Sequence, residues 1–329
     1  MTIKSTFTLT STAVAAAILV AACGGGGGGG NSGSNSSGAT TAPASPSTGN
    51  VSTPQYAADS IQLAAFNVLN QQRQQCGFPS LVENTIHDQA AQAHADYMRQ
   101  NGGTVTDTEA SGNAGFTGVS YSDRAVHFGY PQGVPNGGVS GAFYTNANWS
   151  NTQYGQQLVY GWLSGVYHVG VAFAPLTTIG VGISQTTFNG FPEIFAALSL
   201  ANLQPMPGNS PLTFPCQGTS GVAYKGTAET PTPPNTSGSW GTPIVVVGNP
   251  TDSIVLLTGT ITDTSGNVVA LQLLNSSTDP NKDTPAYESV AYPATALTPN
   301  AQYSVSLTGT VNGKAFSRSF TFTTGNIVG

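Results

Sequence analysis

The sequence predicts an α+β fold, in which a part containing helices and strands precedes an all-β sandwich. Three observations support this prediction. Apolar residues recur at helical spacing between 57 and 101, and short strand-like runs separated by turns fill the chain beyond 241. A Pro-rich stretch at 219–240, which we interpret as a linker, separates the two patterns. The length of 329 residues is sufficient for two ordinary domains.

Charged residues are scarce in this chain. They make up 7% of it, against about 25% in typical soluble domains, while the apolar fraction of 39% is enough to form cores. The net charge is -6, from 14 acidic and 8 basic residues. So few Lys and Arg residues cannot form a basic patch, and we therefore expect no binding to nucleic acid.

The N-terminus predicts export. Lys4 precedes an apolar run at 13–20 that is too short to span a bilayer, and small residues then lead to Cys23. The segment Val20-Ala21-Ala22-Cys23 resembles the lipobox of bacterial lipoproteins. The resemblance implies that residues 1–22 are a lipoprotein signal peptide and that Cys23 receives a diacylglyceryl group, with palmitate-type acyl chains. An ordinary signal peptide with a chance cysteine is the alternative.

The membrane anchor is expected to carry a flexible tether. Residues 23–55 begin with seven glycines after the cysteine and continue with Ser, Asn, Ala, Thr and Pro, which cannot form a core. The localisation expected is extracytoplasmic, on the cell membrane or the outer membrane. Gly24 is not the Asp that would retain a lipoprotein at the inner membrane, so the resemblance favours the outer one in a host with two membranes.

Helices and strands are both predicted between the tether and the linker. Gly77 and Pro79 end the first helix, and Gly102 ends the second. Long loops are expected over most of 103–156. The predicted helices cover 57–75, 85–101, 122–128 and 155–167, and the predicted strands cover 178–184 and 193–200.

The region beyond the linker reads as strands alone. Asn312-Gly313 predicts a tight hairpin, because both turn positions require positive φ. Short strands at this spacing favour a β-sandwich. The predicted strands cover 244–247, 254–262, 268–274, 303–311 and 315–323.

Four sequence blocks in the first part resemble one family. They are Leu-Asn-Gln-Gln-Arg at 69–73 with Gly77 and Leu81, Ala-Ala-Gln-Ala-His-Ala-Asp-Tyr-Met at 90–98, Asp-Arg-Ala at 123–125 with Gly-Tyr at 129–130, and Trp-Leu-Ser-Gly-Val-Tyr-His at 162–168 with Ile-Gly-Val-Gly at 179–182. Together they resemble the bacterial form of the CAP superfamily of cysteine-rich secretory proteins, antigen 5 and plant pathogenesis-related proteins. The resemblance implies an α-β-α sandwich over 56–218.

The last part, 241–329, looks like a bacterial Ig-like module. Leu-Thr-Pro-Asn-Ala-Gln-Tyr at 297–303 and Phe-Thr-Phe-Thr-Thr at 320–324 carry this resemblance. Neither segment indicates a ligand.

Many CAP domains hold two His and two Glu in a cleft, and this chain keeps few of them. His168 matches one His, and Asp107 stands where the other is expected. Gly141-Ala142-Phe143 replaces the triplet that carries the first Glu, and Gln156 and Gln157 occupy the region of the second. We therefore expect no cofactor and no strong metal site, although His168 with Asp107 or Gln157 leaves room for weak binding of a divalent metal.

The other reactive side chains are expected to be structural. Ser164 lies one helical turn before His168 but has no acid nearby in sequence and no nucleophile elbow. His87 and His94 share one helical face, while His127 is expected at the surface and Arg124 in a stabilising contact. With Cys23 used by lipid, Cys76 and Cys216 remain as an even pair in an oxidising compartment, which predicts a disulfide.

These observations favour a non-enzymatic function. We expect a lipid-anchored protein that binds a partner protein or a small apolar ligand at the cell surface. The alternative is a hydrolase acting on an envelope or extracellular polymer, through a modified site at His168 and Asp107 with Glu109. A third interpretation is that the Ig-like part is a spacer that presents the CAP-like part.

Overall fold

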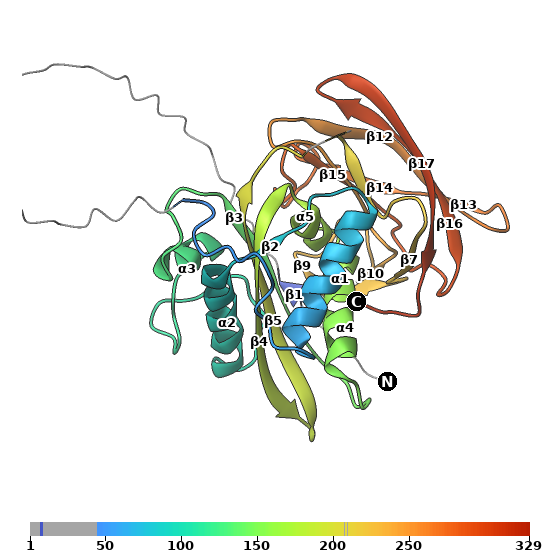
Figure 1. Ribbon diagram of the computed structural model, residues 1–329. Helices are drawn as coiled ribbons and strands as arrows, with labels where there is room; N and C mark the ends of the chain where they lie inside the picture. The colour runs from blue at the N-terminus through green and yellow to red at the C-terminus, as the bar shows by residue number, and fades with distance from the viewer. Residues whose placement is uncertain (1–6, 9–44, 207, 209) are drawn as a thin grey trace, which may run out of the picture.

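The computed structural model describes residues 7–8, 45–206, 208 and 210–329. Cys23, most of the predicted signal peptide and the tether up to residue 44 lie outside the described residues. The first half of the fold has three layers, with a four-stranded sheet in the middle (Figure 1). Its strand order is β2-β4-β5-β3, formed by Val82–Glu83, Leu176–Phe188, Phe191–Leu203 and Asn136–Tyr144.

Helices cover both faces of this sheet (Figure 1). One face carries α2, Thr85–Gln100, and α3, Tyr121–His127. The other carries α1, Ile61–Gln75, α4, Asn151–Ser164, and the short α5, His168–Phe173. The layers agree with the predicted α+β class. None of the described helices is long and apolar enough to span a membrane.

Side-chain caps set the helix starts. Ser60 caps α1 by accepting the Leu63 N–H, and Asp59 before it has a φ of 58°, so the helix begins at 61 and not at 57. Asn84 caps α2 in the same way. Ser150 and Gln153 form a capping box that starts α4 four residues earlier than predicted.

Strand β3 was not predicted, because its small residues give a weak strand signal. It runs antiparallel to β5 at one edge of the sheet. A Cβ at Gly138 would overlap the Tyr121 ring and the Leu198 carbonyl, so the close packing of α3 on this strand requires glycine there. The predicted long loops at 103–156 are therefore wrong at 136–144.

The second half consists of two sheets. One has the order β14-β15-β11-β6 and the other the order β13-β12-β16-β17-β7. The hairpin turn is confirmed, with φ of 51° at Asn312 and 77° at Gly313. The first sheet uses Gln272–Asn275, Glu288–Tyr292, Ile244–Val247 and Leu212–Phe214, and the second uses Val268–Ala270, Ile254–Asp263, Gln302–Val311, Lys314–Thr324 and Thr219–Val222. The predicted strand at 268–274 is divided at Leu271 between the two sheets.

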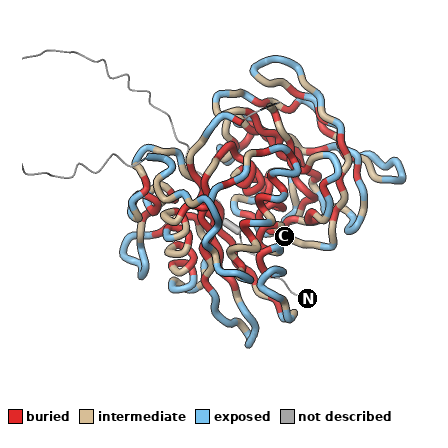
Figure 2. Tube along the Cα trace, in the orientation of Figure 1, coloured by how far each residue is buried: buried red, intermediate tan, exposed pale blue. Residues whose placement is uncertain are grey.

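The predicted linker at 219–240 is part of the fold. Strand β7 pairs with β17, while β8, Gly226–Thr227, pairs with β10, Ser239–Trp240. Trp240 is buried, and one continuous core of buried residues extends from α1 to β17. Figure 2 shows buried segments in both halves of the fold. The two halves therefore share a core, and residues 219–240, predicted as a linker, contribute strands and a buried Trp240 to it.

The boundary between the halves also moves. Strand β6 precedes the predicted end of the first domain at 218 but pairs with β11 of the second half. Phe214 of β6 stacks on Phe173 of α5 with ring centroids 4.1 Å apart. Aromatic contact of this kind couples the two halves directly.

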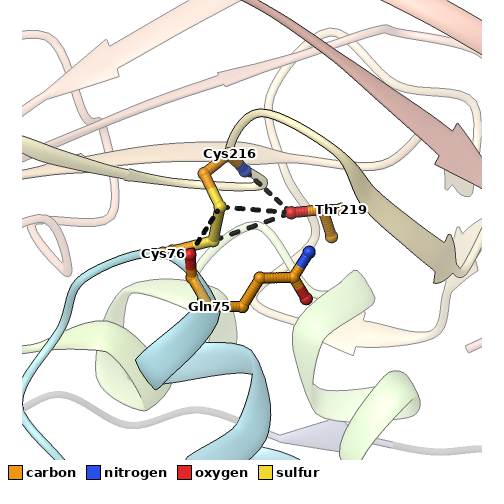
Figure 3. The surroundings of a disulfide bond; sticks show 4 residues. All are labelled: Gln75, Cys76, Cys216 and Thr219. Atoms are coloured by element: carbon orange, nitrogen blue, oxygen red, sulfur yellow. Dashed lines mark hydrogen bonds between the residues drawn. A yellow bond between two sulfur atoms is a disulfide. The ribbon is translucent and has the colours of Figure 1, made fainter.

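The Cys76–Cys216 disulfide is confirmed (Figure 3). Cys76 caps the end of α1, and Cys216 lies between β6 and β7. The Thr219 hydroxyl can donate to either of the two sulfurs, which lie 3.6 and 3.3 Å away, and its oxygen accepts the Cys216 N–H. The bond thus joins the helical layer to the strands of the second half, although both cysteines lie within the first domain predicted at 56–218.

Part of the predicted tether contacts the first half of the fold. Asn50 bridges to Asn84, the Val51 N–H donates to the Glu83 carbonyl, and the Tyr130 hydroxyl donates to the Pro46 carbonyl. These contacts join Pro46, Asn50 and Val51 to the residues around β2, α2 and α3.

A two-residue strand from the predicted signal peptide joins the fold. Strand β1, Phe7–Thr8, pairs in parallel with β9, Glu229–Thr230. Removal of residues 1–22 would free this edge of β9.

Candidate functional site

A group of buried polar side chains lies under α2 and α3. Members come from α2, from the loop that follows it, from α3 and from β3. The imidazole of His94 has its Nδ1 atom 2.9 Å from Glu109 Oε1 and its Nε2 atom 3.1 Å from Ser140 Oγ. The order hydroxyl, imidazole, carboxylate is that of a hydrolase triad, so its hydrogen bonds decide its role.

The hydrogen bonds of His94 show where its protons lie. His94 Nε2 lies 2.7 Å from the Thr106 carbonyl oxygen, which can only accept, so Nε2 carries a proton, and the 2.9 Å bond between Nδ1 and Glu109 Oε1 requires another. The Tyr121 hydroxyl donates to Asp107 Oδ1 at 2.6 Å and lies 2.8 Å from Ser140 Oγ, from which its oxygen can accept. His94 Nε2 therefore has no lone pair to remove a proton from Ser140 in this arrangement.

Glu109 is fixed by its own set of donors. The Thr117 and Gly118 backbone N–H groups donate to Oε2 at 2.7 and 3.3 Å, and the Arg124 guanidinium lies 3.8 Å from Oε1. Although burial alone would raise the pKa of Glu109, its hydrogen bonds and the nearby cations lower it overall. Burial lowers the pKa of His94, and the bond to Glu109 opposes that shift.

Arg124 holds this loop together. Its guanidinium donates to the carbonyls of Asp107, Gly118 and Val119 and covers the Tyr121 ring at 4.3 Å. His94, Ser140 and Arg124 are fully buried, and Asp107 and Glu109 are 1% and 2% exposed. The expectation that Arg124 is stabilising agrees with these contacts.

His168 belongs to a different set of partners. Its Nδ1 atom lies 3.3 Å from Oε1 of Glu229, which comes from β9 in the predicted linker. The Glu229 carboxylate accepts the backbone N–H groups of Val166, Tyr167 and His168 at 2.7, 2.9 and 3.0 Å. Helix α5 has no cap from its own N-cap residue, Tyr167, so a side chain about sixty residues away supplies it.

Burial raises the pKa of Glu229 to about 8, and the three backbone donors act in the opposite direction. A second acid, Glu288, packs against Gly170 of α5, where a Cβ would overlap its carboxylate. Burial, followed by the charge of Asp279, raises the pKa of Glu288 to about 8. The first turns of α5 are therefore surrounded by carboxyl groups from the second half.

The sequence-predicted site residues separate in the structure. Glu109 bonds to His94 and its own loop, while Gln157 Nε2 donates to the Val328 carbonyl at 2.8 Å near the C-terminus. Asp107 bonds to Tyr121, and His168 lies against Glu229. His168, Asp107, Glu109 and Gln157, which the sequence suggested as one site, thus have different partners in these contacts.

A metal ion does not fit the residues that replace the His and Glu pattern of the CAP family. Gly141 has no ligating side chain, and the Gln157 amide is used by a backbone carbonyl. Within the described residues, no three His, Cys, Asp or Glu side chains are placed to hold a metal. Zinc sites in proteins generally need three or four such ligands.

The remaining reactive residues have structural partners. His87 Nδ1 bonds to Ser199 Oγ at 2.8 Å, and burial lowers the pKa of His87 to about 4. Ser164 Oγ donates to the Gly161 carbonyl, as a helical hydroxyl commonly does. His127 is exposed, as expected.

Arg73 was noted only as part of a motif, yet it organises the sheet layer. Its fully buried guanidinium donates to the carbonyls of Pro79, Ala172, Ala174 and Leu176. Burial lowers its pKa to about 9. Five N–H donors in a fixed fork can satisfy this many carbonyls, which explains an Arg at the position.

These contacts are those of an internal scaffold, and a family model matches the region that forms it. Residues 66–198 match the family model described as CAP, the cysteine-rich secretory protein family. This region is a CAP domain. No curated protein matches the chain.

One solved structure shares limited similarity with the chain. It is a DUF4426 family protein from Pseudomonas aeruginosa PAO1, at 19% identity and a TM-score of 0.19. The alignment covers 25% of this chain and 64% of that one.

Proposed function

We propose that this is an exported, lipid-anchored protein whose CAP domain is a non-enzymatic module for binding a surface protein or a small apolar ligand. The observation that carries the proposal is how the ionisable groups are used. Glu109 bonds to His94 and two backbone N–H groups, and Glu229 caps α5 beside His168. Groups engaged in this way stabilise the fold and are not positioned to act on a substrate.

Two further hydrogen bonds support a role for the second half as a rigid support for the CAP domain. Trp240 Nε1 donates to the Ser164 carbonyl at 2.7 Å, and the Tyr167 hydroxyl donates to Asp279 at 3.0 Å. Because α4 and α5 are joined to the β-rich half by these bonds, the proposal treats the two as one presenting unit. An Ig-like topology for that half stays part of the proposal.

The anchor is tested by the mass of the mature protein. A chain that begins at Cys23 and carries acyl groups is expected in the membrane fraction, since two or more chains give stable anchoring. Cys23→Ser is expected to release the protein or to stall its precursor. An intact mass that retains Met1 or lacks Cys23 contradicts the proposal.

A hydrolase is the second candidate, and the Ser140–His94–Glu109 order favours it. The alternative requires His94 Nε2 to leave the Thr106 carbonyl and accept the Ser140 proton. A fluorophosphonate probe tests this: we expect no labelling of the mature protein. Labelling that is lost in Ser140→Ala and kept in Ser164→Ala establishes the hydrolase instead.

A further inference from the structure

A surface pocket opens at one end of the β-rich half, away from the buried polar groups of the CAP domain. Its volume is about 420 Å³, within the usual range for small-molecule sites. The hairpin of β16 and β17 forms one wall, and Ser210 and Pro211 form another. The residues that line it are Ser210, Pro211, Val311, Asn312, Lys314, Ala315, Phe316 and Arg318.

The row of side chains on β17 explains why this end is open. Alternate residues of a strand share a face, so Lys314, Phe316 and Arg318 continue the row of Phe320 and Phe322. The last two are buried in the core, whereas Lys314 is exposed and Arg318 and Phe316 are half-buried. The row that is buried at Phe320 and Phe322 is thus continued toward the hairpin by two cations and an aromatic ring.

The guanidinium of Arg318 is held in place. Its Nη2 donates to the Pro211 carbonyl at 2.8 Å, its Nη1 donates to the Ser317 carbonyl at 2.9 Å, and it lies 5.5 Å from the Phe316 ring centroid. Fixing a long side chain in advance reduces the entropy that binding would otherwise cost.

The charge of the pocket is opposite to that of the protein. The net charge is -6, yet the lining contains two cations and no Asp or Glu. Among the described residues, neither Lys314 nor Arg318 forms a salt bridge. Asp252 does not line the pocket, and it accepts hydrogen bonds from Ser210 and Asn312.

We propose that this pocket binds an anionic sugar unit, with its carboxylate or phosphate on Lys314 and Arg318. Arg and Lys are the side chains that recognise such oxyanions. Apolar surface from Pro211 and Phe316 suits the CH face of a sugar ring, and Ser210 Oγ, which donates to Asp252, can still accept from a sugar hydroxyl group. This site uses no residue of the CAP domain, so the result of its test is independent of the function proposed above.

Calorimetry of the mature protein in detergent, at low salt, tests the site with three probes: trigalacturonic acid, glucose 6-phosphate and maltotriose. We expect one of the two anionic probes to bind with a Kd of about 1 mM or tighter and maltotriose not to bind. The carboxylate and phosphate probes distinguish the two possible oxyanions. Raising the salt concentration should weaken binding, because part of the attraction is between exposed charges.

Variants locate the binding site. Lys314→Ala and Arg318→Ala should each weaken binding by about tenfold, whereas Lys282→Ala, at an exposed cation outside the pocket, should leave it unchanged. The Lys314 residue is exposed, so its variant remains informative if Arg318→Ala unfolds. Binding of neither anion, equal binding of maltotriose, or an equal loss in Lys282→Ala overturns the proposal.

Discussion

The capping of α5 by Glu229 gives the sharpest prediction about how the two halves hold together. Both carboxylate oxygens are used, since Oε2 accepts the Val166 N–H and Oε1 accepts those of Tyr167 and His168. Glu229→Gln keeps the shape but supplies only one acceptor oxygen. At least one backbone N–H must then face an NH₂ group inside a buried site.

The expected loss follows from these bonds. At a pH above about 8, where Glu229 is ionised, a hydrogen bond to its charged carboxylate contributes about 1.5–3 kcal/mol, and a buried donor left without a partner costs about 1–3 kcal/mol. We therefore expect Glu229→Gln to lower the free energy of unfolding by about 2–3 kcal/mol. Urea denaturation followed by circular dichroism measures this loss.

The control is Glu193→Gln, the same change at a partly exposed acid of β5, which should cost less than about 0.5 kcal/mol. Hydrogen exchange gives a second readout, because the amides of 166–168 should lose protection in Glu229→Gln. Equal stability of the two variants, with unchanged protection of these amides, would refute the capping role of Glu229.

Three further predictions follow from the buried groups. Arg73→Met should cost about 3–5 kcal/mol in urea unfolding by leaving buried carbonyls without donors, while Arg99→Met at a half-exposed pair should cost under about 1 kcal/mol. Burial raises the pKa of Glu288 from 4.5 to about 8, so its contribution to stability is fully present below pH 4.5 and is lost as the pH rises to about 8. Glu288→Gln should therefore reduce the difference in free energy of unfolding between pH 5 and pH 8, and an unchanged difference contradicts the shift. Reducing the disulfide at Cys76 should destabilise the protein by up to about 4–5 kcal/mol, given its separation of 140 residues, and free thiols in the oxidised protein would rule the bond out.

Local patterns in the sequence predicted the elements whose stability is local. The first two helices are amphipathic and capped by nearby side chains, and the long strands β4 and β5 carry strong apolar runs. The hairpin at Asn312-Gly313 follows from backbone conformation alone. The disulfide pair followed from the number of cysteines and the predicted compartment.

The errors arose where distant residues determine the structure. Strand β3 is built of small residues because Tyr121 packs against Gly138, a constraint visible only in three dimensions. Pro-rich composition suggested a linker at 219–240, but Glu229 and Trp240 in that stretch bond to α5 and α4. A single sequence contains no signal that pairs residues about sixty positions apart.

The candidate site shows the same limit. Motif matching located His168 and Asp107, and the absence of the family's Glu residues predicted a weak metal site. It did not reveal that Glu109 would bond to His94, or that Glu229 would reach His168. These pairings depend on how the loop after α2 and the chain after β7 fold back.

Zinc calorimetry on the mature protein tests the central claim, that the His and carboxylate groups of the CAP domain support the fold and do not form a metal-dependent active site. The account predicts no zinc site with a Kd below about 1 µM, because no three ligating side chains converge among the described residues. It also predicts that His168→Ala lowers the free energy of unfolding by about 1–3 kcal/mol and leaves zinc affinity unchanged. A submicromolar zinc site that disappears in His168→Ala would contradict it.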